Sequence, residues 1–496
     1  MNIELQVLGH ALRGVAEEMG AALIRSAFSA NIKERRDCST ALFDERGRMV
    51  AQAEHIPVHL GAMPDAVAAV MSRDPGRGDV FILNDPFAGG THLPDITFVS
   101  RTDVGLAVTR AHHADVGGVE PGSMPAASRT LEEEGVVIAP TRLGPETLGE
   151  LAVRMRNRDE RMGDFRAQLA AHRLADERVA ELCARHGPDG VRAAMDELLA
   201  YSERIVRAGI ARLPDGRFEA SDVLEAVEGT LTIRAAVTVA GDELEVDFAG
   251  TDQQHEGNLN CPLSVTRSAA YFVVRCLTAP DVPASAGAFA PVTVVAPRGS
   301  LVNALPGAAV AGGNVETSCR IVDVLFRALG QAVPVPAQGQ GTMNNLTLGN
   351  DRFTYYETIG GGQGACPDGD GPSGVHVTMS NTLTTPVEAL ELAYPLRVRR
   401  HELRLGSGGV GRQRGGDGVV RELEALEACR ASILSERRTN APSGAEGGGP
   451  AEPGRNLLNG RQLPGKATVD LAPGDTLRIE TPGGAGWGTA AEGLAE

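Results

Sequence analysis

The sequence predicts a mixed α+β protein with an N-terminal α/β region over residues 1–213 and a β-rich, glycine-rich C-terminal region over residues 214–496. Three observations support this fold class. Apolar residues repeat at helical spacing at the N-terminus and again over 145–211, which predicts long helices. Short strand-like runs separated by Gly, Pro and Asp occupy residues 38–118. The 61 glycines are well above average usage, and many of them alternate with strand-like runs near the C-terminus.

The N-terminal region is predicted to combine helices with a sheet. Residues 3–28 should form an amphipathic helix, because apolar side chains recur there at spacings of three and four. The expected strands that follow are TALFD, RMVAQ, DVFILND, ITFVS and LAVTRAHH. Over 145–211 the helical period is interrupted at Gly187-Pro188, which predicts a helical hairpin or a pair of long helices.

The C-terminal region is predicted to be mainly strands and turns. TLTIRAAVTVAGDELEVDFAG has the pattern of a hairpin with its turn at Ala240-Gly241-Asp242, and helices are expected at 263–278 and 317–330. The glycine-rich tracts alternate with strand-like runs such as YPLRVRRHELRL, so they are interpreted as turns of an ordered domain. Because no Pro/Ser-rich linker separates the two regions, we expect them to pack closely.

Composition excludes several classes of function. With 47 basic and 64 acidic residues the net charge is -17, which is not the electrostatic signature of a protein that binds nucleic acid or an anionic membrane. No apolar run approaches the roughly 18 residues of a membrane span, and the N-terminus lacks the pattern of a signal peptide. Seven scattered cysteines without a C-x-x-C pair are typical of reduced thiols. A cytoplasmic location is expected.

Potential metal ligands are concentrated in two neighbouring segments. These segments are NDPFAGGTHLPD at residues 84–95 and RAHHAD at residues 110–115. His92 and Asp95 are separated by a turn that can direct both side chains to one point, and the strand ending in His112 and His113 could add a third ligand. Such a mixed N/O site would suit Mn, Fe, Zn or Mg, with Asp115 or the unused histidine orienting a ligand or a water. The alternative is a polar loop with solvated histidines.

Three further residues are candidates for a place beside this cluster. His55 and His59 have the spacing of a helical ligand pair, but Pro57 between them disfavours a helix interior, so both are interpreted as loop histidines. Asp37 follows two arginines, which favours a surface ion pair. Because it also precedes a predicted strand, it could instead turn inward beside the cluster.

Two segments nearly match nucleotide-binding motifs. Residues 406–411, GSGGVG, fit G-x-G-x-x-G, but another turn follows them where a dinucleotide fold requires a helix. Residues 460–467 fit G-x-x-x-x-G-K, but Ala467 stands where Ser or Thr must hold Mg²⁺. We therefore expect this chain to bind no nucleotide of its own.

Longer blocks of sequence carry a family resemblance. They are NDPFAGGTHLPD, RAHHADVGG, VDFAGTDQQHEGNLN, GGNVETSCRIVD, YETIGGGQGA, GPSGVHVTMSNTLTTPVEALE, YPLRVRRHELRLGSGGVGRQRGGDGVVRE and TPGGAGWG. Together they resemble the hydantoinase B family from about Ile3 to Gly488. That family includes the B subunit of N-methylhydantoinase, the C-terminal half of 5-oxoprolinase and the corresponding large subunit of acetone and acetophenone carboxylases.

The resemblance implies a subunit of an ATP-dependent enzyme that hydrolyses a lactam or a hydantoin. An A-type partner with an actin-like ATPase fold would use ATP to phosphorylate the substrate oxygen, and this chain would hold one divalent metal where the activated intermediate reacts. The implied metal ligands are His92, Asp95 and one histidine of the pair His112 and His113, with Asp37 as a further candidate. His112 is favoured as the ligand, although strand alternation alone leaves the choice between the two histidines open. A further pair, His113 and Asp115, is implied in water activation or orientation.

Two alternatives remain open from the sequence. One is a subunit of an acetone- or acetophenone-type carboxylase, in which the same metal site would join an enolate-like species to activated carbon dioxide. The other is an inactive scaffold subunit, which predicts missing ligands. All of the ligands are present, so the scaffold is disfavoured.

Overall fold

The computed structural model describes residues 3–53 and 56–490. Its helices are α1 (Ile3–Ser26), α2 (Ala30–Lys33), α3 (Ala62–Met71), α4 (Leu131–Glu134), α5 (Thr147–Val153), α6 (Arg158–His186), α7 (Pro188–Ile210), α8 (Leu263–Thr278), α9 (Ala286–Phe289), α10 (Ser318–Leu329) and α11 (Val387–Ala393). Short turns of other helical types are η1 (Pro57–His59), η2 (Pro86–Ala88) and the π-helical η3 (Gly313–Thr317).

The strands of the described ranges form four sheets. The first has the order β2-β1-β5-β4-β3-β6, with β1 (Cys38–Asp44), β2 (Met49–Ala53), β3 (Val80–Leu83), β4 (Asp95–Arg101), β5 (Gly105–His112) and β6 (Thr141–Arg142). The second has the order β10-β9-β8-β7, with β7 (Gly216–Glu225), β8 (Thr230–Ala240), β9 (Glu243–Asp247) and β10 (Val292–Val295).

The other two sheets belong to the C-terminal part. One has the order β12-β11-β15-β18, with β11 (Asn345–Gly349), β12 (Thr354–Glu357), β15 (Cys429–Leu434) and β18 (Lys466–Leu471). The last has the order β13-β14-β19-β16-β17, with β13 (Leu396–Arg404), β14 (Gly418–Ala425), β16 (Arg455–Leu458), β17 (Arg461–Leu463) and β19 (Thr476–Glu480).

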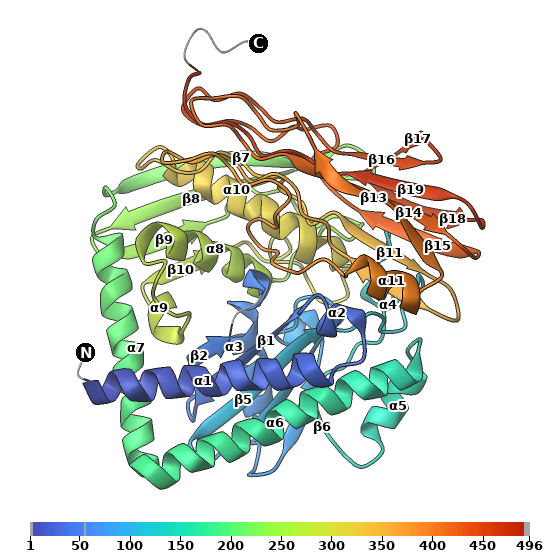
Figure 1. Ribbon diagram of the computed structural model, residues 1–496. Coiled ribbons are helices and arrows are strands. Elements are labelled where there is room, and N and C mark those ends of the chain that lie inside the picture. Colours follow the sequence, from blue (N-terminus) through green and yellow to red (C-terminus); the bar gives the residue numbers. More distant parts are fainter. Residues whose placement is uncertain (1–2, 54–55, 491–496) are drawn as a thin grey trace.

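The first sheet is antiparallel and is covered by helices. Every residue of β1, β2 and β5 is buried. An antiparallel sheet can leave one face in contact with water, so complete burial means that both faces of these strands are packed. The long helices α1 and α6 lie across one face (Figure 1). Their apolar side chains, such as Leu12 and Met19, pack with Leu42 and Ala107 of the sheet in one core cluster.

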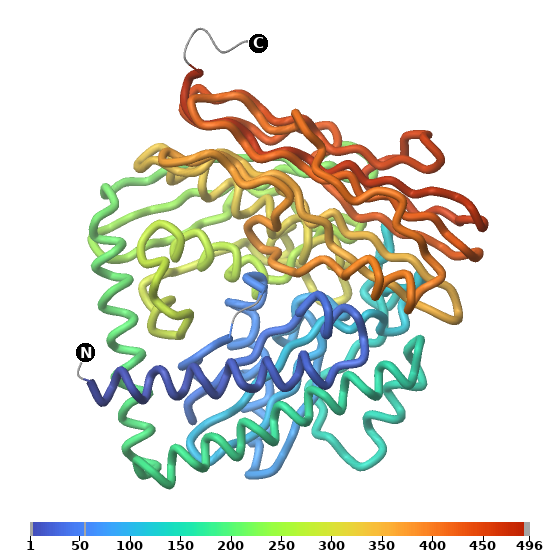
Figure 2. Tube along the Cα trace, in the orientation of Figure 1, coloured from blue at the N-terminus to red at the C-terminus, as the bar shows by residue number. Residues whose placement is uncertain are grey.

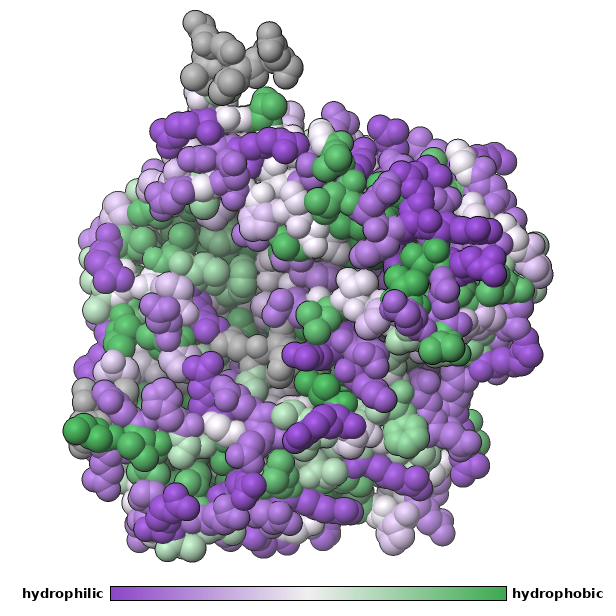
Figure 3. All heavy atoms as spheres, viewed as in Figure 1, coloured by the Kyte–Doolittle hydropathy of each residue, from purple (hydrophilic) through white to green (hydrophobic). Residues whose placement is uncertain are grey.

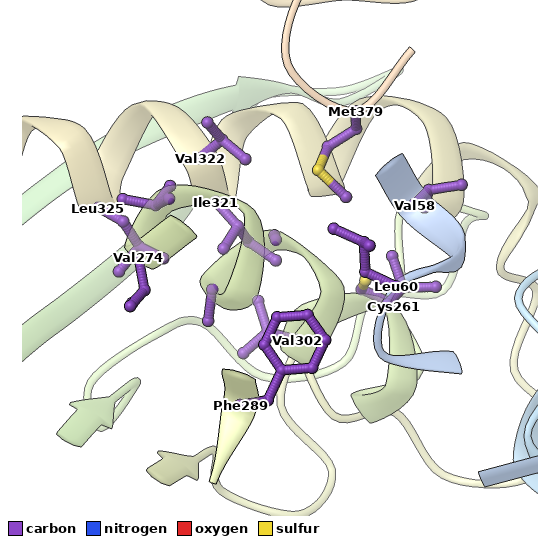
Figure 4. Close-up of a cluster of buried hydrophobic side chains, with 14 of the residues drawn as sticks. Val58, Leu60, Cys261, Val274, Phe289, Val302, Ile321, Val322, Leu325 and Met379 are labelled. Carbon is purple, nitrogen blue, oxygen red and sulfur yellow. The ribbon is translucent and has the colours of Figure 1, made fainter. Parts of the chain in front are cut away.

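The opposite face joins the second half of the chain. Figure 4 shows Val58 and Leu60 in the same cluster as Val274 of α8 and Ile321 of α10. The helix α7 runs along one edge of the molecule from the layer of the first sheet to the layer of β7 and β8 (Figure 2). Hydrogen bonds also link the two halves, since the Asn258 amide donates to the Pro125 carbonyl at 2.7 Å. The helices and strands on both sides of residue 213 therefore share one core.

The predicted fold class is confirmed, and most long elements lie where the sequence placed them. The helix expected at 3–28 is α1, the break at Gly187-Pro188 separates α6 from α7, and the predicted hairpin is β8 and β9. The expected helices at 263–278 and 317–330 are α8 and α10. The two near-motifs for nucleotides do not precede helices. Strand β14 follows residues 406–411, and residues 460–467 include β17 and the start of β18.

The surface shown in Figure 3 mixes hydrophilic and hydrophobic residues over the face in view. Within the described ranges, no helix is long and apolar enough to cross a membrane. All seven cysteines are free thiols, and five of them are buried.

Candidate metal centre

Three strands of the first sheet begin or finish at the same end of the sheet, and this brings the candidate ligands together. Asp95 is the first residue of β4 and is the register partner of His112, the last residue of β5. Asp37 immediately precedes β1, and its carbonyl accepts a hydrogen bond from the His112 amide at 3.0 Å. Antiparallel pairing therefore places residues far apart in sequence at one end of the sheet.

The turn before β4 positions His92. Gly89 has φ of 93°, and a Cβ there would lie 2.1 Å from the Ala66 backbone nitrogen, so only glycine fits this close approach. The buried Asn84 amide donates to the Leu93 carbonyl at 2.8 Å and holds the turn from inside. The glycine pair before His92 thus lets the loop fold tightly against α3.

The side chains of His92, Asp95 and His112 converge on one point. His92 Nε2 lies 3.2 Å from His112 Nδ1 and 3.3 Å from Asp95 Oδ1. Asp95 Oδ1 is 3.4 Å from His112 Nδ1, and all three residues are buried. Asp37 Oδ2 is more distant, at 3.9 Å from His112 Nδ1. Two ring nitrogens and a carboxylate oxygen within this space can act as ligands of one ion.

The charges of the cluster suit a divalent cation. Burial lowers the pKa of His112 to about 4, which keeps its ring neutral at pH 7. Burial opposes ionisation of Asp95, but the adjacent His92, His112 and His59 outweigh it and hold the pKa of that carboxyl well below its usual value. Among the residues that the structure describes, no Lys or Arg forms an ion pair with Asp95. The neutral imidazole of His112 beside the ionised carboxylate of Asp95 suits a divalent metal, which binds deprotonated ligands.

Asp37 is buried at the cluster, and the surface ion pair favoured by its sequence context is wrong. Its carboxyl group faces His112, and burial together with the nearby Asp95 raises the pKa of Asp37 to about 7. Arg35, two residues before Asp37, is also buried and donates to the Thr358 and Thr382 hydroxyls at 2.6 and 2.9 Å, whereas the intervening Arg36 is exposed. Both Arg35 and Asp37 therefore turn inward, as the alternative interpretation allowed for Asp37.

His59 belongs to the site, so its interpretation as a loop histidine is wrong. It ends the turn η1, is buried, and places Nε2 3.4 Å from Asp95 Oδ2 while Nδ1 contacts the Ser39 hydroxyl at 2.9 Å. The proline at position 57 starts this turn instead of excluding a helical conformation. Its sequence companion His55 lies outside the described residues.

The C-terminal half completes the site, which sequence spacing alone did not reveal. Tyr356 of β12 stacks on the His112 ring with centroids 4.4 Å apart. Asn314 lies in the π-helical turn η3, a conformation that is frequent at functional sites. Its side chain is 3% exposed and its Oδ1 has no hydrogen-bond partner. These residues lie on elements more than 200 positions from His92, so only the fold could place them there.

The cluster faces a cavity of about 20 Å³, which is room for about one water or ion. The lining residues are Asp37, Ile56, Val58, His59, His92, Asp95, His112, Asn314, Val315, Met343, Tyr356, Thr358, Ser380 and Thr382. Polar atoms from both halves of the chain therefore surround this space. A molecule larger than a water could enter only if the lining residues moved apart.

His113 does not join the cluster. It follows the end of β5, so its side chain takes the opposite face from His112. Its Nε2 contacts Gln168 Oε1 at 3.0 Å, and its ring packs 5.0 Å from the Phe165 ring on α6. This position does not support its predicted role in activating water.

Asp115 is also directed away from the cluster. Its buried carboxylate accepts hydrogen bonds from the backbone N–H groups of Gly117 and Gly122, at 2.7 and 2.9 Å. It also pairs with the Arg156 guanidinium at 3.0 Å. All of these contacts hold the loop after β5, so the predicted catalytic role of Asp115 is replaced by a structural one.

Replacing Asp115 with Ala is expected to lower the free energy of unfolding by about 3 kcal/mol, because it leaves backbone donors and a guanidinium unpaired. Urea denaturation of the variant and the parent protein measures the change. The metal content of the folded variant should equal that of the parent protein. A variant that was as stable as the parent but had lost turnover would contradict the structural role and indicate a catalytic role for Asp115.

The comparisons with known proteins cover nearly the whole chain. The family model described as "Hydantoinase B/oxoprolinase" matches residues 1–490. The 5-oxoprolinase 1 of Arabidopsis thaliana is 39% identical over 98% of this chain, which corresponds to 42% of that protein. The chain thus spans about two fifths of the length of this longer relative.

Two other matches are similar in length to this chain. The putative D-/L-hydantoinase B subunit of Pseudomonas sp. strain NS671 is 31% identical, with 99% of this chain and 90% of that protein covered. The crystal structure of the ATP-dependent caprolactamase from Pseudomonas jessenii superimposes with a TM-score of 0.91 and 27% identity, covering 98% of this chain and 91% of that one.

Proposed function

Because this chain belongs to the hydantoinase B/oxoprolinase family, we propose that it is the metal-carrying B-type subunit of an ATP-dependent enzyme that hydrolyses a cyclic amide. The observation that carries the proposal is the buried convergence of His92, Asp95 and His112, with Asp37 beside them. Relatives named as a hydantoinase subunit and as an ATP-dependent caprolactamase support a lactam or a hydantoin as the substrate class.

In this proposal His92, Asp95 and His112 hold the ion, and Asp37 is a fourth candidate ligand. A bound divalent ion such as Mn, Zn, Fe or Mg would lower the pKa of a coordinated water from its bulk value towards about 7. His59 supports the site by contacting the second oxygen of Asp95. The unpartnered Asn314 Oδ1 can accept a hydrogen bond from the attacking water, which orients that water in the cavity.

The proposal assigns activation of the amide to a partner subunit. An unstrained amide carbon is a poor electrophile, and phosphorylation of its oxygen makes that carbon more reactive. Neither glycine-rich segment of this chain has the helix that a nucleotide phosphate site needs. We therefore propose an A-type ATPase partner that phosphorylates the ring oxygen, after which this chain's site supplies the water.

An assay with the partner, ATP and a cyclic amide tests this function against the carboxylase alternative. Ring opening is expected without added bicarbonate, because hydrolysis consumes only water. The same pair given a ketone should consume no bicarbonate. Carboxylation of the ketone that depends on bicarbonate, with no ring opening, would contradict the proposal and favour a carboxylase.

A further inference from the structure

A second and larger cavity lies beside the metal cluster. It has a volume of about 400 Å³ and opens between α1 and β2, the edge strand of the first sheet. Arg13, Glu17 and Arg25 are the charged residues that line it from the helix, and Arg36 and Gln52 line it from the sheet side. At this size it can accept a small organic molecule, which the cavity at the cluster cannot.

The charge of this cavity differs from that of the whole chain. Arg13 is paired with Glu17 at 3.0 Å, but Arg25 and Arg36 form no ion pair within residues 3–53 and 56–490. The protein as a whole carries a net charge of -17. Two unneutralised guanidinium groups in one concave site attract an anion, and arginine binds carboxylate and phosphate groups through paired N–H donors.

Gln52 adds a second recognition element. Its side chain is 4% exposed, and neither its amide nitrogen nor its amide oxygen has a hydrogen-bond partner in the structure. Buried polar groups are normally hydrogen-bonded, so two unpaired atoms on one buried side chain need an explanation. A bound ligand could supply the missing partners. A carboxamide offers a donor and an acceptor side by side. Its complement is a planar edge with a neighbouring acceptor and donor, as in the cis amide of a lactam ring.

The cavity and the cluster share neighbouring walls. Arg36 lines the cavity, and the next residue, Asp37, lines the cluster. Ala53 lines the cavity and Ile56 lines the cluster, and a chain of three residues spans at most about 11 Å. Residues adjacent in sequence therefore line the two cavities, which connects the walls of both through the chain at Arg36-Asp37.

We propose that this cavity binds a small anion that carries an amide edge. Arg25 and Arg36 contact the charged group and Gln52 pairs with the amide edge. The amide class of the ligand rests on the proposed function, whereas the anion preference rests on the arginines alone. The charge can come from a carboxylate on the ring or from the phosphate of an activated amide, and both would be held by the same guanidinium groups.

Calorimetric titration of the chain alone tests the proposal. The probes are 5-oxoproline, which has a lactam and a carboxylate, 2-pyrrolidinone, which lacks the carboxylate, and inorganic phosphate. We expect 5-oxoproline or phosphate to bind at least about ten-fold more tightly than 2-pyrrolidinone. Tighter binding of 5-oxoproline assigns the anion to a ring carboxylate, and tighter binding of phosphate assigns it to the activated amide.

Two variants and a matched control locate the site. Arg36→Gln should weaken binding of either anion about ten-fold, and Gln52→Met should weaken 5-oxoproline by a similar factor. Arg46→Gln removes the same charge from an exposed position outside the cavity and should leave binding unchanged. Because Arg36 is exposed, its variant should fold even if the buried Gln52→Met does not.

The proposal is overturned if none of the three probes binds saturably, or if binding is unaffected by Arg36→Gln. These titrations need no ATP, partner or turnover. A chain that binds 5-oxoproline but supports no ring opening with its partner would therefore contradict the proposed function and leave the cavity assignment in place. Ring opening by the pair, together with probe binding that does not depend on Arg36, would contradict the cavity assignment and leave the proposed function in place.

Discussion

Mixed with a cognate A-type subunit and ATP, the protein is expected to open the ring of a hydantoin or a lactam, whereas the chain alone is expected to open none. The reason is chemical, because in the proposed function the candidate cluster activates water and the partner activates the amide oxygen. Titration of the isolated chain with ATP should give no measurable binding. A product assay with and without the partner measures whether ring opening requires that partner.

The contradicting results for this prediction are specific. Micromolar binding of ATP by the lone chain would mean that one of the glycine-rich segments, 406–411 or 460–467, binds phosphate without a helix. Hydrolysis of an unactivated lactam by the lone chain would mean that the metal site alone suffices. Either result would place the activation chemistry in this polypeptide.

Replacing Asp95 with Asn is expected to reduce turnover of the reconstituted pair by at least about 1000-fold, since the charged ligand contributes several kcal/mol to the site. Asp95 contacts His92 and His112 through one oxygen and His59 through the other, so the variant disturbs all three rings. Initial rates of ring opening measure the effect, and folding is checked by thermal unfolding.

A matched control for that variant is Asp103→Asn. Asp103 is exposed and pairs only with surface groups such as Arg77, so its substitution should change turnover by less than about two-fold. If Asp95→Asn retained turnover within about ten-fold of the parent while folded, the cluster would not be the catalytic centre.

Local sequence patterns predicted much of the fold and part of the site. Helical periodicity located α1 and α7 because these helices bury a mainly apolar stripe. The same period located α6, although its buried face also includes Arg161, Asp164 and Gln168. The pair His92 and Asp95 was identified because both lie in one short turn. By contrast, β7 was not predicted as a separate strand, because its inward face places Gly216 and Asp222 among the apolar residues Phe218, Ala220 and Leu224.

The rest of the site depends on tertiary structure. Whether His112 or His113 faced the metal depended on where β5 ends, and strand alternation without the register could not decide it. His59 was discounted because Pro57 suggested an extended loop, although proline is favoured at the first position of a helical turn. Asn314 and Tyr356 come from distant segments, and no local pattern associates them with the cluster.

Elemental analysis of purified protein tests the central claim most directly. We predict about one divalent ion per chain in the parent protein, less than about one tenth of that in Asp95→Asn, and parental content in His113→Gln. His113 is a suitable comparison because it is equally buried but faces Gln168 instead of the cluster. Equal metal content in all three folded proteins, or loss of metal only in His113→Gln, would contradict the assignment of His92, Asp95 and His112 as the metal centre.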